Sequence, residues 1–170
     1  MSQEQALQIR LADERDLDDL CGLYQAAIDE MNQHQIFQWD ECYPNRMVLA
    51  DDIQKKQLNV VLLEKQLAAA YVVNQECDEQ YANGQWRFPD SAYAVIHRLC
   101  VHPKFQNQGI AAKVMKQIED MQRGHGMEVI RLDAFTKNPF ALKLYRKLDY
   151  HEVGLAYWRK GAFFLMEKRL

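Results

Sequence analysis

The chain alternates between two spacings of apolar residues, and each spacing predicts a different kind of element. In residues 17–31 and 110–121, apolar side chains recur every three or four positions, as they do along one face of a helix. Shorter helices are predicted at 46–57 and 139–148. Strand-length apolar runs, several of them rich in β-branched residues, lie at 7–12, 59–64, 67–74, 92–101, 127–135, 150–158 and 162–170.

Polar residues mark the connections between these elements. Lys65 and Gln66 separate two apolar runs, a spacing that predicts a β-hairpin. Asn138 stands where it can cap the helix that Pro139 opens. The stretch 75–91 is polar and is expected to form a loop.

Helices and strands therefore alternate, with hairpins near both ends. This order predicts an α/β or α+β class with a mixed central sheet of about seven strands flanked by helices. The length of 170 residues suits one hydrophobic core, and no internal repeat or Pro/Gly/Ser-rich linker divides the chain. We therefore expect a single domain over residues 1–170. The final run, "AFFLMEKRL", is expected to be an exposed edge strand, which makes it a candidate for pairing two copies in a homodimer.

Composition narrows the classes of function. The net charge is −3, from 21 Lys and Arg against 24 Asp and Glu, so the basic footprint of a nucleic-acid binder is missing. No basic segment followed by a long apolar run opens the chain, and no apolar stretch has the length of a bilayer span. We therefore expect a cytoplasmic protein without a membrane partner. The four cysteines are widely spaced without a CxxC pair, so they predict neither a metal site nor a disulfide framework.

The segment "QNQGIA", residues 106–111, joins a strand to a helix through small and polar residues. The first turn of a helix leaves N–H groups unpaired and carries about half a positive charge, so it attracts anions. Gly109 and Ala111 would let an anion approach the backbone, and Gln106 and Gln108 would add donors. The Walker and GxGxxG patterns of nucleotide sites are absent. An ordinary turn that needs small residues for packing explains this segment equally well.

Three segments around this turn carry more information. "RLCVHPKFQNQGIAAKVM", "IRLDAF" and "NPFALKLYRKLDY" together resemble the core of the GNAT N-acetyltransferase superfamily in its bacterial members, over residues 92–156. In that family, Q/R-x-x-G-x-G/A marks the loop that binds the pyrophosphate of acetyl-coenzyme A. The resemblance implies the acyl-CoA N-acyltransferase fold and acetyl-CoA as co-substrate, without a metal.

The resemblance also implies a role for each matching residue. The backbone of Leu99 and Val101 would contact the pantetheine arm, and their amides would polarise the thioester carbonyl. Asn138 would contact the pantetheine, and Tyr145 would contact the coenzyme and protonate the departing thiolate. The residues that would cradle the pyrophosphate are Gln106, Asn107, Gln108, Gly109, Ile110, Ala111 and Ala112.

Plain structural interpretations stand beside these roles. Asn138 caps a helix whether or not it contacts a ligand. Tyr145 shares a helical stripe with apolar residues, which is typical of a core aromatic. Cys100 lacks the His–Asp pattern that would mark a nucleophile, so we expect it in the core. The chain also departs from the family pattern: Gln106 replaces a common Arg, which leaves backbone amides as the main anion ligands, and Asp149 replaces a left-handed Gly.

The acceptor side is less sharply defined. His97 is one candidate for the base that takes the amine proton, and a hydrogen-bonded structural histidine is the alternative. Strand alternation places Arg98 on the opposite face from His97 and places His97 in a row with Tyr93, Val95, Leu99 and Val101. Where the family places part of its acceptor wall, this chain has aromatic and acidic residues that suit either a cationic amine or an ordinary packed loop, namely Trp39, Asp40, Glu41 and Tyr43.

These observations predict an N-acetyltransferase that moves an acetyl group from acetyl-CoA to a primary amine. The acceptor would be a small molecule or a peptide, attacking directly in a ternary complex. A non-catalytic acyl-CoA sensor with the same fold is the alternative, and a structural domain without a ligand is a third hypothesis.

Overall fold

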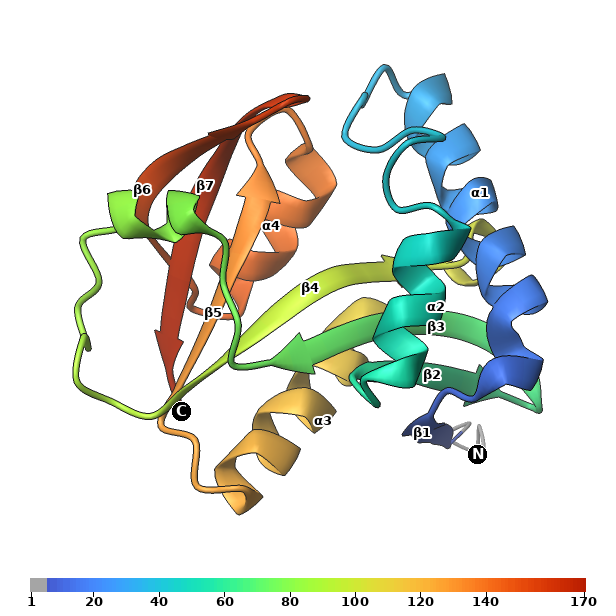
Figure 1. The fold of residues 1–170 in the computed structure, drawn as a ribbon, viewed down its shortest axis with the longest axis horizontal. Coiled ribbons are helices and arrows are strands. Elements are labelled where there is room, and N and C mark those ends of the chain that lie inside the picture. Colours follow the sequence, from blue (N-terminus) through green and yellow to red (C-terminus); the bar gives the residue numbers. More distant parts are fainter. Residues whose placement is uncertain (1–5) are drawn as a thin grey trace.

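A seven-stranded mixed sheet forms the centre of the molecule, in the order β1-β2-β3-β4-β5-β7-β6 (Figure 1). The computed structural model describes residues 6–170. The strands are β1 (Leu7–Leu11), β2 (Leu58–Leu63), β3 (Gln66–Asn74), β4 (Tyr93–Val101), β5 (Val129–Phe135), β6 (His151–Trp158) and β7 (Gly161–Arg169). The helices are α1 (Leu17–Gln33), α2 (Arg46–Gln54), α3 (Ile110–Gly124) and α4 (Pro139–Lys147). The predicted fold class is confirmed.

Two of the helices, α2 and α4, begin at an asparagine cap. The Asn45 side chain accepts from the N–H of Val48 at the start of α2, and the Asn138 side chain accepts from the N–H of Ala141 at the start of α4. Asp149 ends the turn after α4 in the left-handed conformation expected there, with a φ of 67°. Within residues 6–170, each helix is too short or too polar to cross a membrane.

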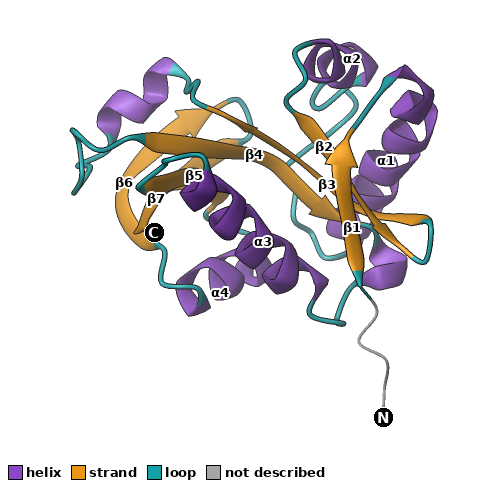
Figure 2. Cartoon of the chain, turned by 90° about the horizontal axis from the view of Figure 1, so that it is seen from below, coloured by secondary structure: helices purple, strands orange, loops and turns teal. Residues whose placement is uncertain are grey.

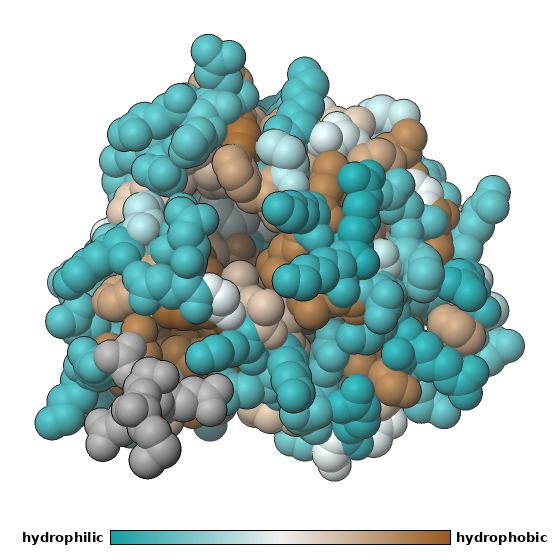
Figure 3. All heavy atoms as spheres, turned by 180° about the vertical axis from the view of Figure 1, so that it is seen from behind, coloured by the Kyte–Doolittle hydropathy of each residue, from teal (hydrophilic) through white to brown (hydrophobic). Residues whose placement is uncertain are grey.

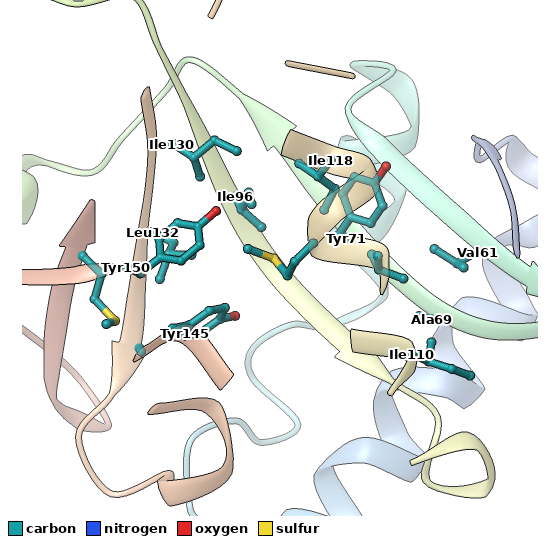
Figure 4. Close-up of a cluster of buried hydrophobic side chains, with 14 of the residues drawn as sticks. Val61, Ala69, Tyr71, Ile96, Ile110, Ile118, Ile130, Leu132, Tyr145 and Tyr150 are labelled. Carbon is teal, nitrogen blue, oxygen red and sulfur yellow. The ribbon is translucent and has the colours of Figure 1, made fainter. Parts of the chain in front are cut away.

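Two helical layers cover opposite faces of the sheet (Figure 2). α1 and α2 pack on one face, in a cluster that includes Leu20, Leu49 and Val60. α3 and α4 pack on the other face, in a cluster that includes Met115, Tyr145 and residues from β2 to β5 (Figure 4). Because apolar side chains alternate along the central strands, each face of the sheet has its own core.

The sheet opens between β4 and β5. These two parallel strands pair only at their beginnings, through Tyr93–Val129, Ala94–Ile130 and Val95–Arg131. Beyond these pairs the strands diverge, as Figure 1 shows. Since β3 still pairs with β4 and β7 still pairs with β5, the opening lies inside one continuous sheet. It leaves main-chain groups of both strands without a partner strand.

A bulge interrupts β4 beside this opening. Arg98 takes a left-handed conformation with a φ of 51°. Arg98 and Leu99 together oppose a single residue of β3, which kinks the strand and reverses its alternation beyond that point. The cross-strand pairs on the two sides of the bulge are His97–Val72 and Cys100–Ala70.

The bulge makes one prediction wrong. His97 was expected to share a face with Leu99 and Val101, but both of these residues pack with Ile96 in the cluster against α3. Ile96 and His97 are neighbours before the bulge, so their side chains point to opposite faces of the sheet. The extra residue in β4 then brings Leu99 and Val101 to the face of Ile96.

Three other expectations about the strands and loops need correction. The hairpin turn between β2 and β3 consists of Glu64 and Lys65, because Gln66 already pairs with Leu63. The polar stretch 75–91 contains a short 3₁₀ helix, η2 (Glu79–Asn83), whose Tyr81 is buried. β7 is not an edge strand, because it pairs along its length with β5 on one side and β6 on the other. Whether the chain forms a homodimer stays a prediction.

Candidate active site

The turn before α3 presents unpaired main-chain donors. Gly109 is left-handed with a φ of 73°, no side chain caps the helix, and the first backbone bond of α3 runs from the Lys113 N–H to the Gly109 carbonyl at 3.1 Å. The preceding helical N–H groups, those of residues 110–112, have no acceptor among the described residues. The space that a Cβ on Gly109 would occupy is open. These features fit an anionic group such as a diphosphate.

The two glutamines of this turn are already engaged. Gln106 donates from Nε2 to the carbonyl of Val101 at 3.3 Å, and Gln108 donates from Nε2 to the carbonyl of Lys104 at 3.3 Å. Asn107 is exposed and left-handed, with a φ of 61°. The side chains therefore brace the turn, and the backbone amides remain the free donors.

The face behind the sheet in Figure 1 is hollowed, with apolar side chains at the bottom of the depression (Figure 3).

Asn138 and Tyr145 lie on the α4 side of the opening. The Asn138 cap is confirmed, at 3.1 Å from the N–H of Ala141, and its Nδ2 donates to Gln38 Oε1 at 3.0 Å. Tyr145 packs edge-on against Tyr150, with ring centroids 5.8 Å apart, beside Leu132 of β5 (Figure 4). Burial raises the pKa of the Tyr145 phenol, so this group stays protonated at neutral pH.

The β4 bulge is held by buried polar contacts. Arg98 makes a two-pronged ion pair with Asp52 of α2, from Nε to Oδ2 at 3.0 Å and from Nη2 to Oδ1 at 2.5 Å. Arg98 also donates to the hydroxyl of Tyr43 at 2.7 Å. The hydroxyl of Tyr24 on α1 donates to the carbonyl of Arg98 at 2.7 Å. The bulge is therefore fixed from two helices and one loop.

His97 is tied to the segment after β3. Its Nε2 lies 2.8 Å from Asn74 Oδ1 and 3.1 Å from the carbonyl of Glu76. Because both partners are oxygens, Nε2 carries the hydrogen in neutral His97 and the free lone pair is on Nδ1. Burial lowers the pKa of His97 to about 4. The imidazole is therefore neutral at pH 7 and a weak base.

Asp133 is the residue at this opening that sequence reasoning missed. It follows Arg131, the last residue of β5 that pairs with β4, by two positions, so extending the register places it across from His97. Its Oδ2 accepts from the hydroxyl of Tyr81 at 2.7 Å. Burial raises the pKa of Asp133 to about 6, although the Tyr81 hydrogen bond opposes the shift. A carboxylate inside the apolar run "VIRLDAF" was the available signal.

Aromatic stacking holds Tyr81 in place. Its ring stacks on Trp86 with centroids 5.6 Å apart, and Trp86 Nε1 donates to the Tyr81 carbonyl at 2.9 Å. The Trp158 ring meets Tyr81 edge-on at 6.3 Å. Nothing in the sequence pattern links this loop to β5. The long-range contact between Tyr81 and Asp133 is a product of the tertiary structure.

Four residues of the loop after α1 were predicted to line the acceptor site. In the structure they lie in different environments. Trp39 is buried and packs on Tyr24 with ring centroids 5.7 Å apart. Asp40 forms a two-pronged ion pair with Arg159, at 2.7 and 2.8 Å, which holds the pKa of the Asp40 carboxyl well below its usual range. Glu41 is exposed, and Tyr43 contacts Arg98 as described above. Their acceptor roles stay predictions.

Potential metal ligands are scattered. Across residues 6–170, the His, Cys, Asp and Glu side chains form no group of three or more that could hold a metal ion. Cys100 is buried in the core, as expected, and burial raises the pKa of its thiol.

Known proteins resemble this chain in sequence and in fold. A family model described as acetyltransferase (GNAT) family matches residues 24–150. N-alpha-acetyltransferase RimI of Mycobacterium tuberculosis is 36% identical over 69 residues, a match that spans 41% of this chain and only 41% of the relative. A GNAT-family acetyltransferase structure from Streptococcus agalactiae has a TM-score of 0.84 at 26% identity and covers 98% of this chain and 96% of its own.

A solved structure of lower sequence identity has the same fold. The structure of the PaiA N-acetyltransferase of Thermoplasma acidophilum, solved in complex with coenzyme A, has a TM-score of 0.71 at 15% identity, covering 97% of this chain and 99% of that one. The family model includes β4, the turn before α3, β5 and α4, and it matches well over half of the residues. Fold, turn and matched segment thus lead to one conclusion: this chain is a member of the acetyltransferase (GNAT) family.

Proposed function

We propose that this protein transfers the acetyl group of acetyl-CoA to a primary amine of a small molecule or peptide, by direct attack in a ternary complex. One observation carries the proposal: the unpaired donors before α3 lie beside an opened sheet, with a carboxylate on one face of β5 and a phenol on the other. Membership of the family supports it, as does the coenzyme A bound by the PaiA relative.

On the donor side, the backbone N–H groups of residues 108–112 would hold the pyrophosphate, with Gln106 and Asn107 at its edge. The free main-chain groups of Leu99 and Val101 would contact the pantetheine arm, and Asn138 would meet that arm from α4. The Leu99 amide, turned by the bulge, would donate to the thioester oxygen as negative charge develops there. The co-substrate supplies an acyl group already activated as a thioester.

On the acceptor side, the amine must lose a proton before its nitrogen can attack the thioester carbon. Asp133 suits this step better than His97, because a base with a pKa of about 6 is ionised at pH 7 and still accepts a proton more readily than one with a pKa of about 4. Tyr81 holds the carboxylate in place. We therefore assign the base to Asp133 and keep His97 as the competing candidate.

The second proton transfer completes the reaction. As the new C–N bond forms, the C–S bond breaks and the thiolate of coenzyme A needs a proton. Tyr145 is buried on the opposite face of β5 from Asp133, among residues that include Leu132 and Ala134. Strand alternation therefore places the acid and the base on the two faces of one strand. The phenol, kept protonated by burial, is suited to donate.

A pH profile tests this function. Release of free coenzyme A thiol is followed with acetyl-CoA and a panel of amines, from polyamines and amino acids to peptide N-termini. We expect kcat to rise as pH increases through about 6, where Asp133 loses its proton, and to level off above. Asp133→Asn should lower kcat by about 10²- to 10⁴-fold and remove this rise of kcat with pH.

The controls separate the candidates. If kcat instead rises near pH 4 and this rise disappears in His97→Gln, then His97 is the base. Tyr145→Phe should slow turnover while leaving acetyl-CoA binding intact. Binding of acetyl-CoA without turnover of any amine in the panel would reject the enzyme and favour the acyl-CoA sensor.

A further inference from the structure

A cavity of about 290 Å³ lies at the end of β5, lined by three separate segments. They are the loop after α1, the end of β5 and the turn between β6 and β7, which meet at one end of the molecule (Figure 1). We call this cavity the anion subsite, and its lining residues are Gln35, Phe37, Phe135, Lys137, Arg159 and Lys160.

The anion subsite lies one step along β5 from the proposed base. Phe135 follows Asp133 by two residues, and both pair regularly with β7, so their side chains project from the same face of the strand. Two strand residues span about 7 Å. A molecule whose amine contacts Asp133 would therefore reach the subsite with a group about 7 Å or more from its nitrogen.

The charge of the subsite is positive. Three cations line it, and one nearby carboxylate, Asp40, faces two of them. Arg159 occupies both oxygens of Asp40, while Lys160 lies 3.4 Å from Oδ2. Lys137 is exposed and has no ion-pair partner among the described residues. The positive charge is local, because the chain as a whole carries a net charge of −3.

The apolar part of the subsite contains one exposed ring, Phe37, and one buried ring, Phe135. Phe37 is 54% exposed, although the loop that carries it buries its neighbours Ile36 and Trp39. Phe135 lines the cavity and packs on Phe163 with ring centroids 5.1 Å apart. An exposed aromatic ring and an unpaired lysine around one small cavity fit a ligand with an aliphatic segment that ends in an anion.

We propose that the anion subsite binds the carboxylate of the acceptor, so that the preferred substrates are ω-amino acids or short peptides with a free C-terminus. This inference rests on the proposed function and adds the substrate class to it. The amine would be directed to Asp133, the chain between the two charged groups would lie along β5 over Phe135, and the carboxylate would meet Lys137 and Lys160.

Matched acceptors test the proposal. ε-Aminocaproate and hexylamine share the amine and the chain length but differ by the carboxylate, as do glycylglycine and its C-terminal amide. We expect kcat/KM to be at least about tenfold higher for the carboxylate member of each pair. Lys137→Gln should remove most of that advantage and leave hexylamine within about twofold.

A matched lysine provides the control. Lys137 also lines a separate cavity of about 560 Å³, together with Lys143 of α4, which is exposed but does not line the anion subsite. Lys143→Gln should leave the preference for ε-aminocaproate unchanged. If Lys137→Gln instead raises KM for acetyl-CoA and affects both amines equally, the lysine serves the coenzyme and the proposal is overturned.

Binding is measured separately from turnover. Calorimetric titration of ε-aminocaproate into the protein with coenzyme A should give a dissociation constant that rises about tenfold in Lys137→Gln. If no amine is turned over but this binding and its loss are seen, the proposed function fails and the subsite stands. Equal binding of ε-aminocaproate and hexylamine rejects the subsite, whatever the turnover.

Discussion

The donor side and the acceptor side of the opened sheet are built in different ways. The pyrophosphate-binding part of the proposed donor side is one continuous stretch, from the end of β4 through the turn before α3, and its chemical groups are main-chain amides. The acceptor side takes Asp133 from β5, Tyr81 from the 3₁₀ helix after β3, and Lys137, Phe37 and Arg159 from three further places. A local site of backbone groups leaves a short sequence motif, whereas a site of distant side chains does not.

The largest expected effect falls on the donor side. Gly109→Glu places a carboxylate beside the free amides of α3, so it should abolish acetyl-CoA binding. At about 100 times the dissociation constant, a ligand stabilises its protein by about 2.7 kcal/mol, which for this size raises Tm by about 5 to 10 °C. We expect thermal unfolding to show this rise in the wild type and none in Gly109→Glu.

The control for this change keeps the backbone and omits the charge. In Gly109→Asn, the new asparagine tolerates the left-handed conformation better than most residues do, and its side chain is neutral. It should retain at least half of the shift in Tm. If both variants lose the shift equally, strain at φ 73° explains the result, and the donor side does not depend on main-chain electrostatics alone.

A smaller effect separates function from stability on the acceptor side. The pKa of Asp133 rises from an ordinary 3.8 to about 6 in the folded protein, so the folded state holds the proton more tightly. This contribution to stability is present below pH 3.8 and is lost as pH rises through about 6. Asp133→Asn cannot ionise and still accepts from Tyr81. It should therefore stabilise the protein by about 1 to 3 kcal/mol at pH 8.

Urea unfolding at two pH values checks this prediction. The gain in the free energy of unfolding for Asp133→Asn should appear at pH 8 and be near zero at pH 4. If Asp133→Asn is less stable than the wild type at pH 8, the ionised carboxylate stabilises the folded state. The assignment of Asp133 as a functional group that costs stability would then lose its support.

The smallest effect concerns the bulge that joins the two sides. Tyr24→Phe leaves the carbonyl of Arg98 without its donor, so we expect the free energy of unfolding to fall by about 1 to 2 kcal/mol, with a lower kcat. Tyr71→Phe is the matched control, because Tyr71 is equally buried but its hydroxyl has no hydrogen-bond partner among residues 6–170. Equal losses in the two variants would mean that the hydroxyl of Tyr24 does not hold the bulge.

What the sequence reveals correctly is local. The helix cap Asn138, the left-handed Asp149 and the small residues before α3 each depend on neighbours within a few positions, so their patterns identify them. The seven strands and four helices follow from apolar spacing for the same reason. The family resemblance also rests on such contiguous motifs, and the match over residues 24–150 confirms it.

What only the tertiary structure decides is the meeting of distant side chains. The extra residue at Arg98 reverses the faces of Leu99 and Val101, and no alternation rule anticipates a bulge without the partner strand. Tyr81 and Asp133 are 52 positions apart, and Asp40 and Arg159 are 119 apart. Each pair forms because packing of the sheet brings two distant segments together. Such partners are close in space but not in sequence, so no periodic pattern along the chain predicts them.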